Sequence, residues 1–292
     1  MVARIIILTL TSGSVYAVLA SGMSLVFGVA HIVNLAHTAF YVLAAYLLWY
    51  FFNVLGLPPA ASVAITLAAT TVLGMLSYRF LLDRVRQHAQ VVLLLTIALA
   101  LLIQEILLGT FEAHLRTVYP PLLPSGTVSI LGVTVQIQQL VIIGAVAVIM
   151  VGLWLFLQRT KAGVAIRATA NDAEVANLMG ISVSRTLLMV MAIGTALAGV
   201  AAILISSTWV FHPWAWSTSL TMILAIIVLG GLGSLKGSIL GAYIIALAET
   251  LLISLAPGYG YLKTAVGLAA MIIVLSLRPG GLFGIVFEEE KL

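Results

Sequence analysis

The sequence predicts an all-α, polytopic membrane protein, and three observations support this prediction. Hydrophobic residues make up 63% of the 292 positions, and charged residues only 8%. In soluble domains, roughly 25% of the residues are charged. The mean hydropathy is +1.23. The apolar residues form continuous runs and do not alternate with polar ones, which is typical of spanning helices and argues against a β-barrel.

Apolar runs along the whole chain account for the expected helices. They lie at about residues 5–28, 38–56, 60–82, 90–110, 139–158, 183–206, 218–232, 238–256 and 261–277. Most approach the ~20 residues needed to cross the hydrocarbon core, so we expect about eight or nine transmembrane helices in a single transmembrane domain over 1–292. The run 218–232 is short and ends in glycines, which favours a half-span or a re-entrant element.

The basic residues predict the orientation in the membrane. Three of the 13 Lys and Arg residues, Arg4, Arg116 and Lys263, fall on one side of the predicted topology. The other ten flank loops of the opposite side: Arg79, Arg84, Arg86, Arg159, Lys161, Arg167, Arg185, Lys236, Arg278 and Lys291. The positive-inside rule makes that side cytoplasmic and leaves the N-terminus outside, unless 28–38 only dips into the bilayer. Since this explains the net charge of +4, we expect no nucleic acid partner.

Two segments on the outer side carry local signals. The outer loop 111–138 holds three prolines and Gly126, followed by the alternating sequence VSILGVTVQIQ, which predicts a short hairpin at the membrane surface. A second segment is rich in aromatic residues: Trp209, Phe211, His212, Pro213, Trp214 and Trp216. It is either an interfacial aromatic belt or a contact surface for an external protein.

The cytoplasmic segment 159–185 lies between two apolar runs; it is polar and contains residues that predict the start and end of a helix. Asn171 at an N-cap with Glu174 three residues later, and Gly180 as the C′ residue, predict a short helix over about 172–179. Such a capped segment is either an ordinary connector or a coupling helix that docks on a soluble partner. The residues expected to carry that contact are Asn171, Asp172, Ala173, Glu174, Ala176, Met179 and Gly180.

The polar stretch between the first two apolar runs predicts a broken helix. His31, Asn34 and His37 fall within 28–38, and such groups inside a membrane are expensive unless they line a pathway or are packed in protein. The stretch is therefore either part of a solute path or a polar interfacial turn. The two histidines are six residues apart with no carboxylate nearby, so we expect no metal site.

Gly230, Gly231 and Gly233 form the third candidate feature, in the sequence LGGLGSLKGS. This is not a phosphate-binding loop, because G-x-x-x-x-G-K-[ST] occurs nowhere in the chain. Glycines permit positive φ and close backbone approach. The run is either a tight turn between helices or a hinge beside the solute path.

Glu105 and Glu249 are the carboxylates expected within spans. Without an intramembrane Lys or Arg partner, these two carboxylates are weak evidence for an ion-coupling pathway, and polar packing is the simpler interpretation of Glu249. A secondary transporter or channel that uses these two carboxylates remains an open alternative. A membrane enzyme is a more distant one, because the sequence has no cysteine and no visible nucleophile–base pair.

Four stretches together resemble the permease subunits of branched-chain amino acid ABC importers. They are GMSLVFGVAHIVNLAH, LLLTIALALLIQE, GVAIRATANDAEVANLMGIS and VLGGLGSLKGSILGAYIIALAE, in an order and spacing that cover nearly the whole chain. Thr38 and Lys236 stand where the family usually has glycine and proline, and Leu35 replaces an aromatic residue. The family also includes importers of urea, short amides and aromatic acids.

The resemblance implies a single transmembrane permease domain in the cell membrane of a prokaryote. It also implies a second permease subunit, two cytoplasmic ATPases that bind ATP and Mg²⁺, and an extracytoplasmic solute-binding protein. The chain itself would then be a transport subunit and not an enzyme. On this interpretation, His31, Asn34, His37 and the three glycines belong to the substrate path, and the helix after Asn171 contacts the ATPase.

Overall fold

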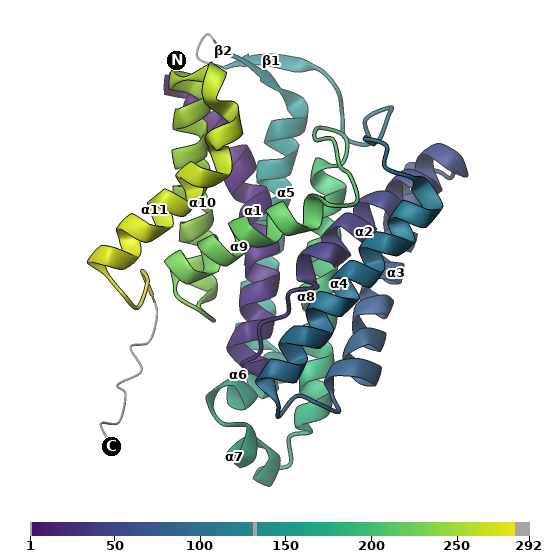
Figure 1. The fold of residues 1–292 in the computed structure, drawn as a ribbon, viewed down its shortest axis with the longest axis vertical. Helices are drawn as coiled ribbons and strands as arrows, with labels where there is room; N and C mark the ends of the chain where they lie inside the picture. The colour runs from purple at the N-terminus through teal and green to yellow at the C-terminus, as the bar shows by residue number, and fades with distance from the viewer. Residues whose placement is uncertain (1, 131–132, 284–292) are drawn as a thin grey trace.

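The computed structural model describes residues 2–130 and 133–283, and it is an elongated bundle of helices (Figure 1). The long helices are α1 (Val2–Ala30), α3 (Pro59–Ser77), α4 (Ala89–Phe111), α5 (Ile137–Arg159), α8 (Val183–Ile205), α10 (Leu235–Leu255) and α11 (Lys263–Leu277). With the turns that extend α3 and α11, seven segments of the described residues are long and apolar enough to span a membrane. The shorter helices α2 (His37–Trp49) and α9 (Ala215–Gly230) lie among them. The predicted polytopic all-α class is confirmed.

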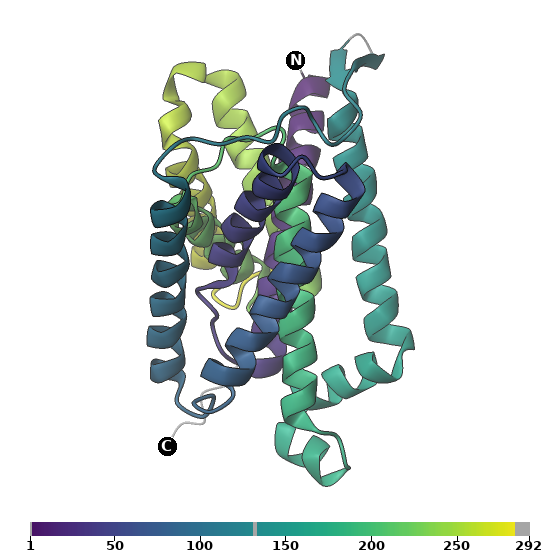
Figure 2. The same ribbon diagram turned by 90° about the vertical axis from the view of Figure 1, so that its right-hand side faces the viewer.

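The two ends of the bundle differ in structure and in charge. At one end, α6 (Lys161–Asn171) and α7 (Ala173–Leu178) project beyond the other helices (Figure 2). Apart from Arg167 within α6 and Lys291, which lies outside the described residues, the basic residues that were predicted to be cytoplasmic lie on loops or at helix ends. The N-terminus lies at the opposite end, beside the hairpin (Figure 1). Since α1 runs through the bundle, the alternative with an inner N-terminus is not supported.

The outer hairpin forms where the sequence predicts it. Strands β1 (Thr127–Ile130) and β2 (Val133–Gln136) pair antiparallel, with Val128 opposite Val135. The same outer layer contains a bridge between Arg116 and Phe211, which joins the loop after α4 to the loop after α8. The aromatic segment 209–216 is therefore held against the rest of the outer face.

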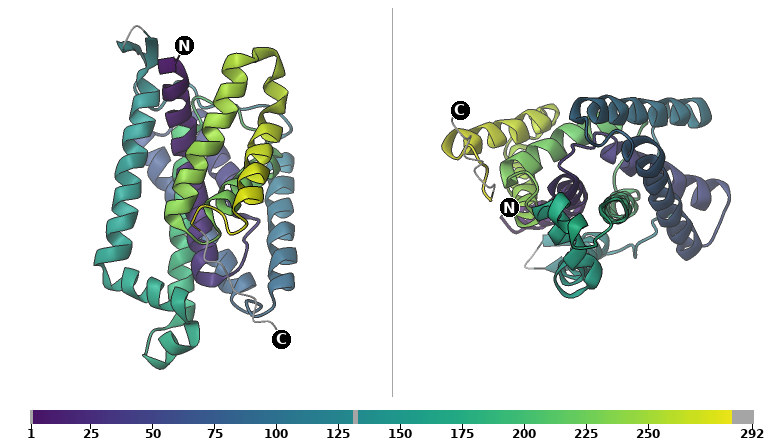
Figure 3. Two further views of the ribbon diagram at one scale, coloured as in Figure 1. Left: turned by 90° about the vertical axis from the view of Figure 1, so that its left-hand side faces the viewer. Right: turned by 90° about the horizontal axis from the view of Figure 1, so that it is seen from below.

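Helix α1 is the centre of the bundle, because small residues let several helices approach it. It contacts α5, α8, α9 and α10, and Figure 3 shows it beside α10 from a second direction. A Cβ added at Gly13 would meet the Tyr243 ring of α10 at 2.4 Å, and one at Gly22 would meet the Gly194 carbonyl of α8 at 2.9 Å. Close approach at small residues is the usual way in which membrane helices associate.

The predicted break between the first two apolar runs is present. Helix α1 ends at Ala30, His31 adopts φ +52°, and the chain re-enters the bundle to start α2 at His37. The His37 Nε2 atom lies 3.0 Å from the Leu19 carbonyl oxygen, so α2 begins beside the middle of α1. The Thr38 hydroxyl donates a hydrogen bond to the Trp216 carbonyl at 3.0 Å, and the start of α9 is thereby fixed next to the start of α2.

Candidate functional site

The segment 159–185, predicted to be cytoplasmic, is more helical than expected. Helix α6 occupies the whole of Lys161–Asn171, and the Thr160 hydroxyl caps it by accepting a bond from the Gly163 N–H at 2.9 Å. The predicted N-cap of the short helix was wrong by one residue. Asp172 is the N-cap, and its Oδ1 accepts bonds from the N–H groups of Glu174 and Val175 at 2.8 and 2.9 Å. Asn171 is instead the last residue of α6, because that helix continues to its end.

The C-terminal cap of α7 matches the prediction. Gly180 has φ +85°, its N–H bonds to the Asn177 carbonyl, and the Ile181 N–H bonds to the Ala176 carbonyl. These two bonds make a Schellman motif. Ala176 is buried, so its side chain packs inward, whereas Leu178 and Met179 are 85% and 79% exposed. The tip of α7 therefore presents an apolar surface at the basic end of the bundle.

The three residues of the broken segment that were predicted to line a solute path lie in different surroundings. His31 is exposed at the basic end and lines hollows next to α7. Asn34 is buried; its Oδ1 accepts the Ala36 N–H at 3.1 Å and its Nδ2 lies 3.5 Å from the Met191 sulfur. His37 is also buried, against Leu19. Asn34 therefore stabilises the turn that starts α2.

The glycine run forms a close-packed turn between α9 and α10. Gly231 and Gly233 have φ +99° and +80°, which only glycine adopts without strain. A Cβ at Gly230 would meet the Gly237 carbonyl at 2.3 Å, and a Cβ at Gly28 would meet the Gly233 carbonyl oxygen at 2.8 Å. The turn is thus in van der Waals contact with the inner part of α1.

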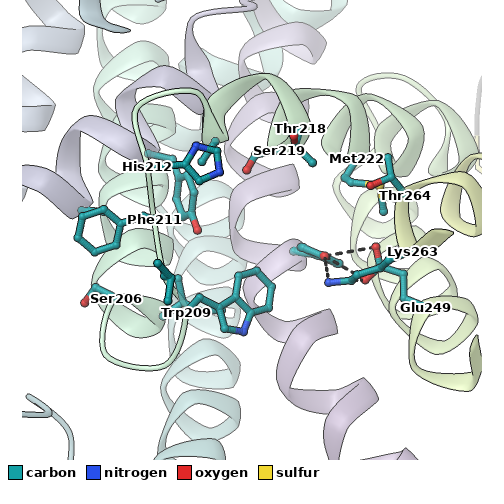
Figure 4. Close-up of a pocket in the computed structure, with 16 residues that line it drawn as sticks. Ser206, Trp209, Phe211, His212, Thr218, Ser219, Met222, Glu249, Lys263 and Thr264 are labelled. Carbon is teal, nitrogen blue, oxygen red and sulfur yellow. Dashed lines mark hydrogen bonds and ion pairs between the residues drawn. The ribbon is translucent and has the colours of Figure 1, made fainter. Parts of the chain in front are cut away.

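A cavity in the outer half of the bundle was not predicted from the sequence. It has a volume of about 210 Å³ and is lined by residues of α1, α2, the end of α8, α9, α10, the start of α11 and the aromatic segment. Figure 4 shows Trp209 and His212 on one side and Glu249 and Lys263 on the other. The aromatic segment, expected to be a belt or an external contact surface, supplies one wall of this cavity.

Tyr16, Glu249 and Lys263 form a polar cluster in that cavity. The Lys263 Nζ lies 3.0 Å from the Glu249 Oε2 and 3.1 Å from the Tyr16 hydroxyl oxygen. The Tyr16 hydroxyl in turn donates to Glu249 Oε2 at 3.0 Å. Lys263 also faces the Trp209 ring, with Nζ 4.9 Å from its centroid. The expectation that Glu249 has no basic partner in the membrane was therefore wrong.

The other predicted intramembrane carboxylate has different surroundings. Glu105 is exposed on α4, and its Oε1 accepts a bond from its neighbour Gln104 at 3.2 Å. Gln104 Oε1 accepts the Trp216 indole N–H at 2.7 Å. Within residues 2–130 and 133–283, no group of three or more His, Asp or Glu side chains could hold a metal ion.

Comparisons with known proteins agree with this architecture. Residues 5–275 match a family model described as the permease component of a branched-chain amino acid transport system. The chain is 29% identical over 289 residues to the high-affinity branched-chain amino acid transport system permease protein BraD of Pseudomonas aeruginosa, covering 94% of this chain and 93% of the relative. It is 27% identical over 291 residues to LivH of Escherichia coli, covering 94% and 92%. No solved structure matches the chain.

Proposed function

Because the chain belongs to the family of permease components of branched-chain amino acid transport systems, we propose that it forms the translocation path of an ATP-driven importer for branched-chain or other small amino acids. It is a multi-pass membrane protein and a transport subunit. The chain has no phosphate-binding loop. On this proposal, ATP and Mg²⁺ bind to two ATPase subunits in the cytoplasm.

We propose that the projecting helix pair α6–α7 contacts the ATPase. It stands at the basic end of the bundle (Figure 1), it is capped by Thr160, Asp172 and Gly180, and its tip exposes Leu178 and Met179. An amphipathic helix that inserts an apolar face into a groove is a common docking mode. The predicted contact residues other than Ala176 are exposed, and they surround this tip.

The outer and inner features fit the two ends of a solute path. The outer cavity would receive solute from an extracytoplasmic binding protein, and the glycine turn against Gly28 would close the inner side. We assign Gly230, Gly231 and Gly233 to this closure and Asn34 and His37 to the packing behind it. A second permease subunit, identical or homologous, would complete the membrane part.

The test is purification of the tagged chain, followed by transport in proteoliposomes. An ATPase should co-purify, and leucine uptake should require ATP inside and be inhibited by vanadate. Uptake by the chain alone, driven by a proton or sodium gradient, would refute the importer and support a secondary transporter. ATP-driven uptake of urea, short amides or aromatic acids without leucine would keep the mechanism but change the substrate class.

A further inference from the structure

The polar cluster in the outer cavity fits a specific chemical group. We propose that Glu249, Lys263 and Tyr16 bind the zwitterionic head group of an α-amino acid on its way through the membrane. This inference rests on the proposed transport function and deepens it, because it names the groups that recognise the solute. Glu249 would pair with the α-ammonium group, and Lys263 and the Tyr16 hydroxyl with the α-carboxylate.

The first argument is the position of the ion pair. Glu249 lies on α10 with its side chain 2% exposed, and its partner Lys263 begins α11 with its side chain 32% exposed. Charged groups within a membrane protein are rare, and they usually mark a pathway or pair with one another. Here Glu249, Lys263 and the Trp209 ring all line one cavity (Figure 4). A ligand can therefore reach both charges.

The second argument is charge balance. The pair has no net charge, and burying an unpaired charge is strongly unfavourable. A cation or an anion that displaced one partner would leave an uncompensated charge in the cavity. A zwitterion instead gives each partner an opposite charge and replaces one ion pair by two. The cluster therefore selects a neutral solute that carries both signs.

The third argument is that part of the lining is apolar and suits an apolar side chain. Ala45, Ile205 and Met222 contribute apolar surface to the cavity, next to the Trp209 ring. Pockets for small molecules commonly combine such apolar walls with a few fixed polar groups. A branched aliphatic side chain would contact these residues when its head group meets Glu249 and Lys263.

The test uses a cysteine placed in the cavity wall. The chain has no cysteine, so a thiol reagent added to Ser219→Cys in nanodiscs reports on this cavity alone. Leucine, without a solute-binding protein, should slow modification roughly tenfold, which corresponds to about 90% occupancy. Isocaproate lacks the ammonium group and isopentylamine lacks the carboxylate, so neither should protect. Equal protection by either analogue would overturn the head-group assignment. Thr264→Cys, also in the cavity wall, provides a second reporter if Ser219→Cys does not fold.

A neutral pair distinguishes recognition from a purely structural role. Replacing a buried ion pair by uncharged side chains often leaves stability unchanged, so Glu249→Gln/Lys263→Met should assemble and melt like the wild type. It should nevertheless lose leucine protection, and uptake should fall roughly 30-fold or more, as expected when a buried charge partner is removed from a ligand. Retained protection would overturn the proposal.

A matched control and the wild-type complex distinguish failure of the head-group site from failure of the proposed transport function. Glu105→Gln removes the exposed carboxylate of α4 and should keep both protection and uptake; loss of protection in that variant would show that the effect is not specific to the cavity. A wild-type complex that imports no amino acid with ATP would refute the proposed function. Normal uptake by the neutral pair would refute the head-group site alone.

Discussion

Replacing Gly28 with alanine tests whether the glycine turn closes against α1. The change adds one methyl group inside a helix, which by propensity alone would stabilise that helix by about 1 kcal/mol. The added Cβ would, however, lie 2.8 Å from the Gly233 carbonyl oxygen and 3.1 Å from the Gly233 Cα atom. Backbone atoms cannot rotate away, and overpacking of this kind costs about 1–3 kcal/mol. We therefore expect a net destabilisation of about 0–2 kcal/mol from these two opposing contributions.

Gly144→Ala is the matched control for this variant. Gly144 also lies within a helix, α5, but a Cβ there has no neighbour within 4 Å. It should gain the propensity contribution of about 1 kcal/mol without a clash. The difference in unfolding free energy between the two variants, measured by denaturant titration in detergent, should then be about 1–3 kcal/mol. Equal stabilisation by both alanines would show that the turn does not rest on α1.

Three further substitutions test the inner half of the molecule. Leu178→Asp should abolish ATPase co-purification while membrane insertion is retained. The control Leu115→Asp changes a leucine of the outer loop that is 69% exposed, and it should keep ATPase co-purification. An intact complex with Leu178→Asp would contradict the docking assignment. Asn34→Leu removes the acceptor for the Ala36 N–H. We therefore expect a loss of about 1–3 kcal/mol in unfolding free energy in the same titration, together with reduced uptake. Wild-type stability and uptake would contradict the role of Asn34 in the turn. Gly231→Leu places a side chain at φ +99°, which should abolish uptake and solute-stimulated ATP hydrolysis but not ATPase binding, and full transport would show that the turn is only a connector.

The parts of the fold that depend on short stretches of sequence were predictable. Apolar runs determine spans because each helix must satisfy its backbone hydrogen bonds internally within the membrane. The pairing of 127–130 with 133–136 follows from their alternating pattern, and the C-terminal cap at Gly180 follows from local turn chemistry. The N-cap of α7 was misplaced because Asn171 and Asp172 are both good caps. The choice between them depends on how far α6 extends, which the cap residues do not specify.

The outer cavity could not be located from any one segment. The Tyr16 hydroxyl meets Glu249 across 233 residues and Lys263 across 247, so helix packing alone brings the cluster together. One signal was available, because a carboxylate inside a span requires a partner. Lys263 opens the next apolar run after Glu249, and two consecutive antiparallel helices place such residues at the same depth.

The same two helices connect the cavity to the inner turn. Helix α9 contributes Met222 to the cavity and ends in Gly230 at the turn, and α10 starts beside that turn and carries Glu249 in the cavity. Gly230 and Gly237 hold the two helices in direct backbone contact. Helix α1 meets this helix pair at both places, because Gly28 lies against Gly233 at the inner turn and Tyr16 bonds Glu249 in the cavity. The inner turn and the cavity are therefore joined by the same three helices, α1, α9 and α10.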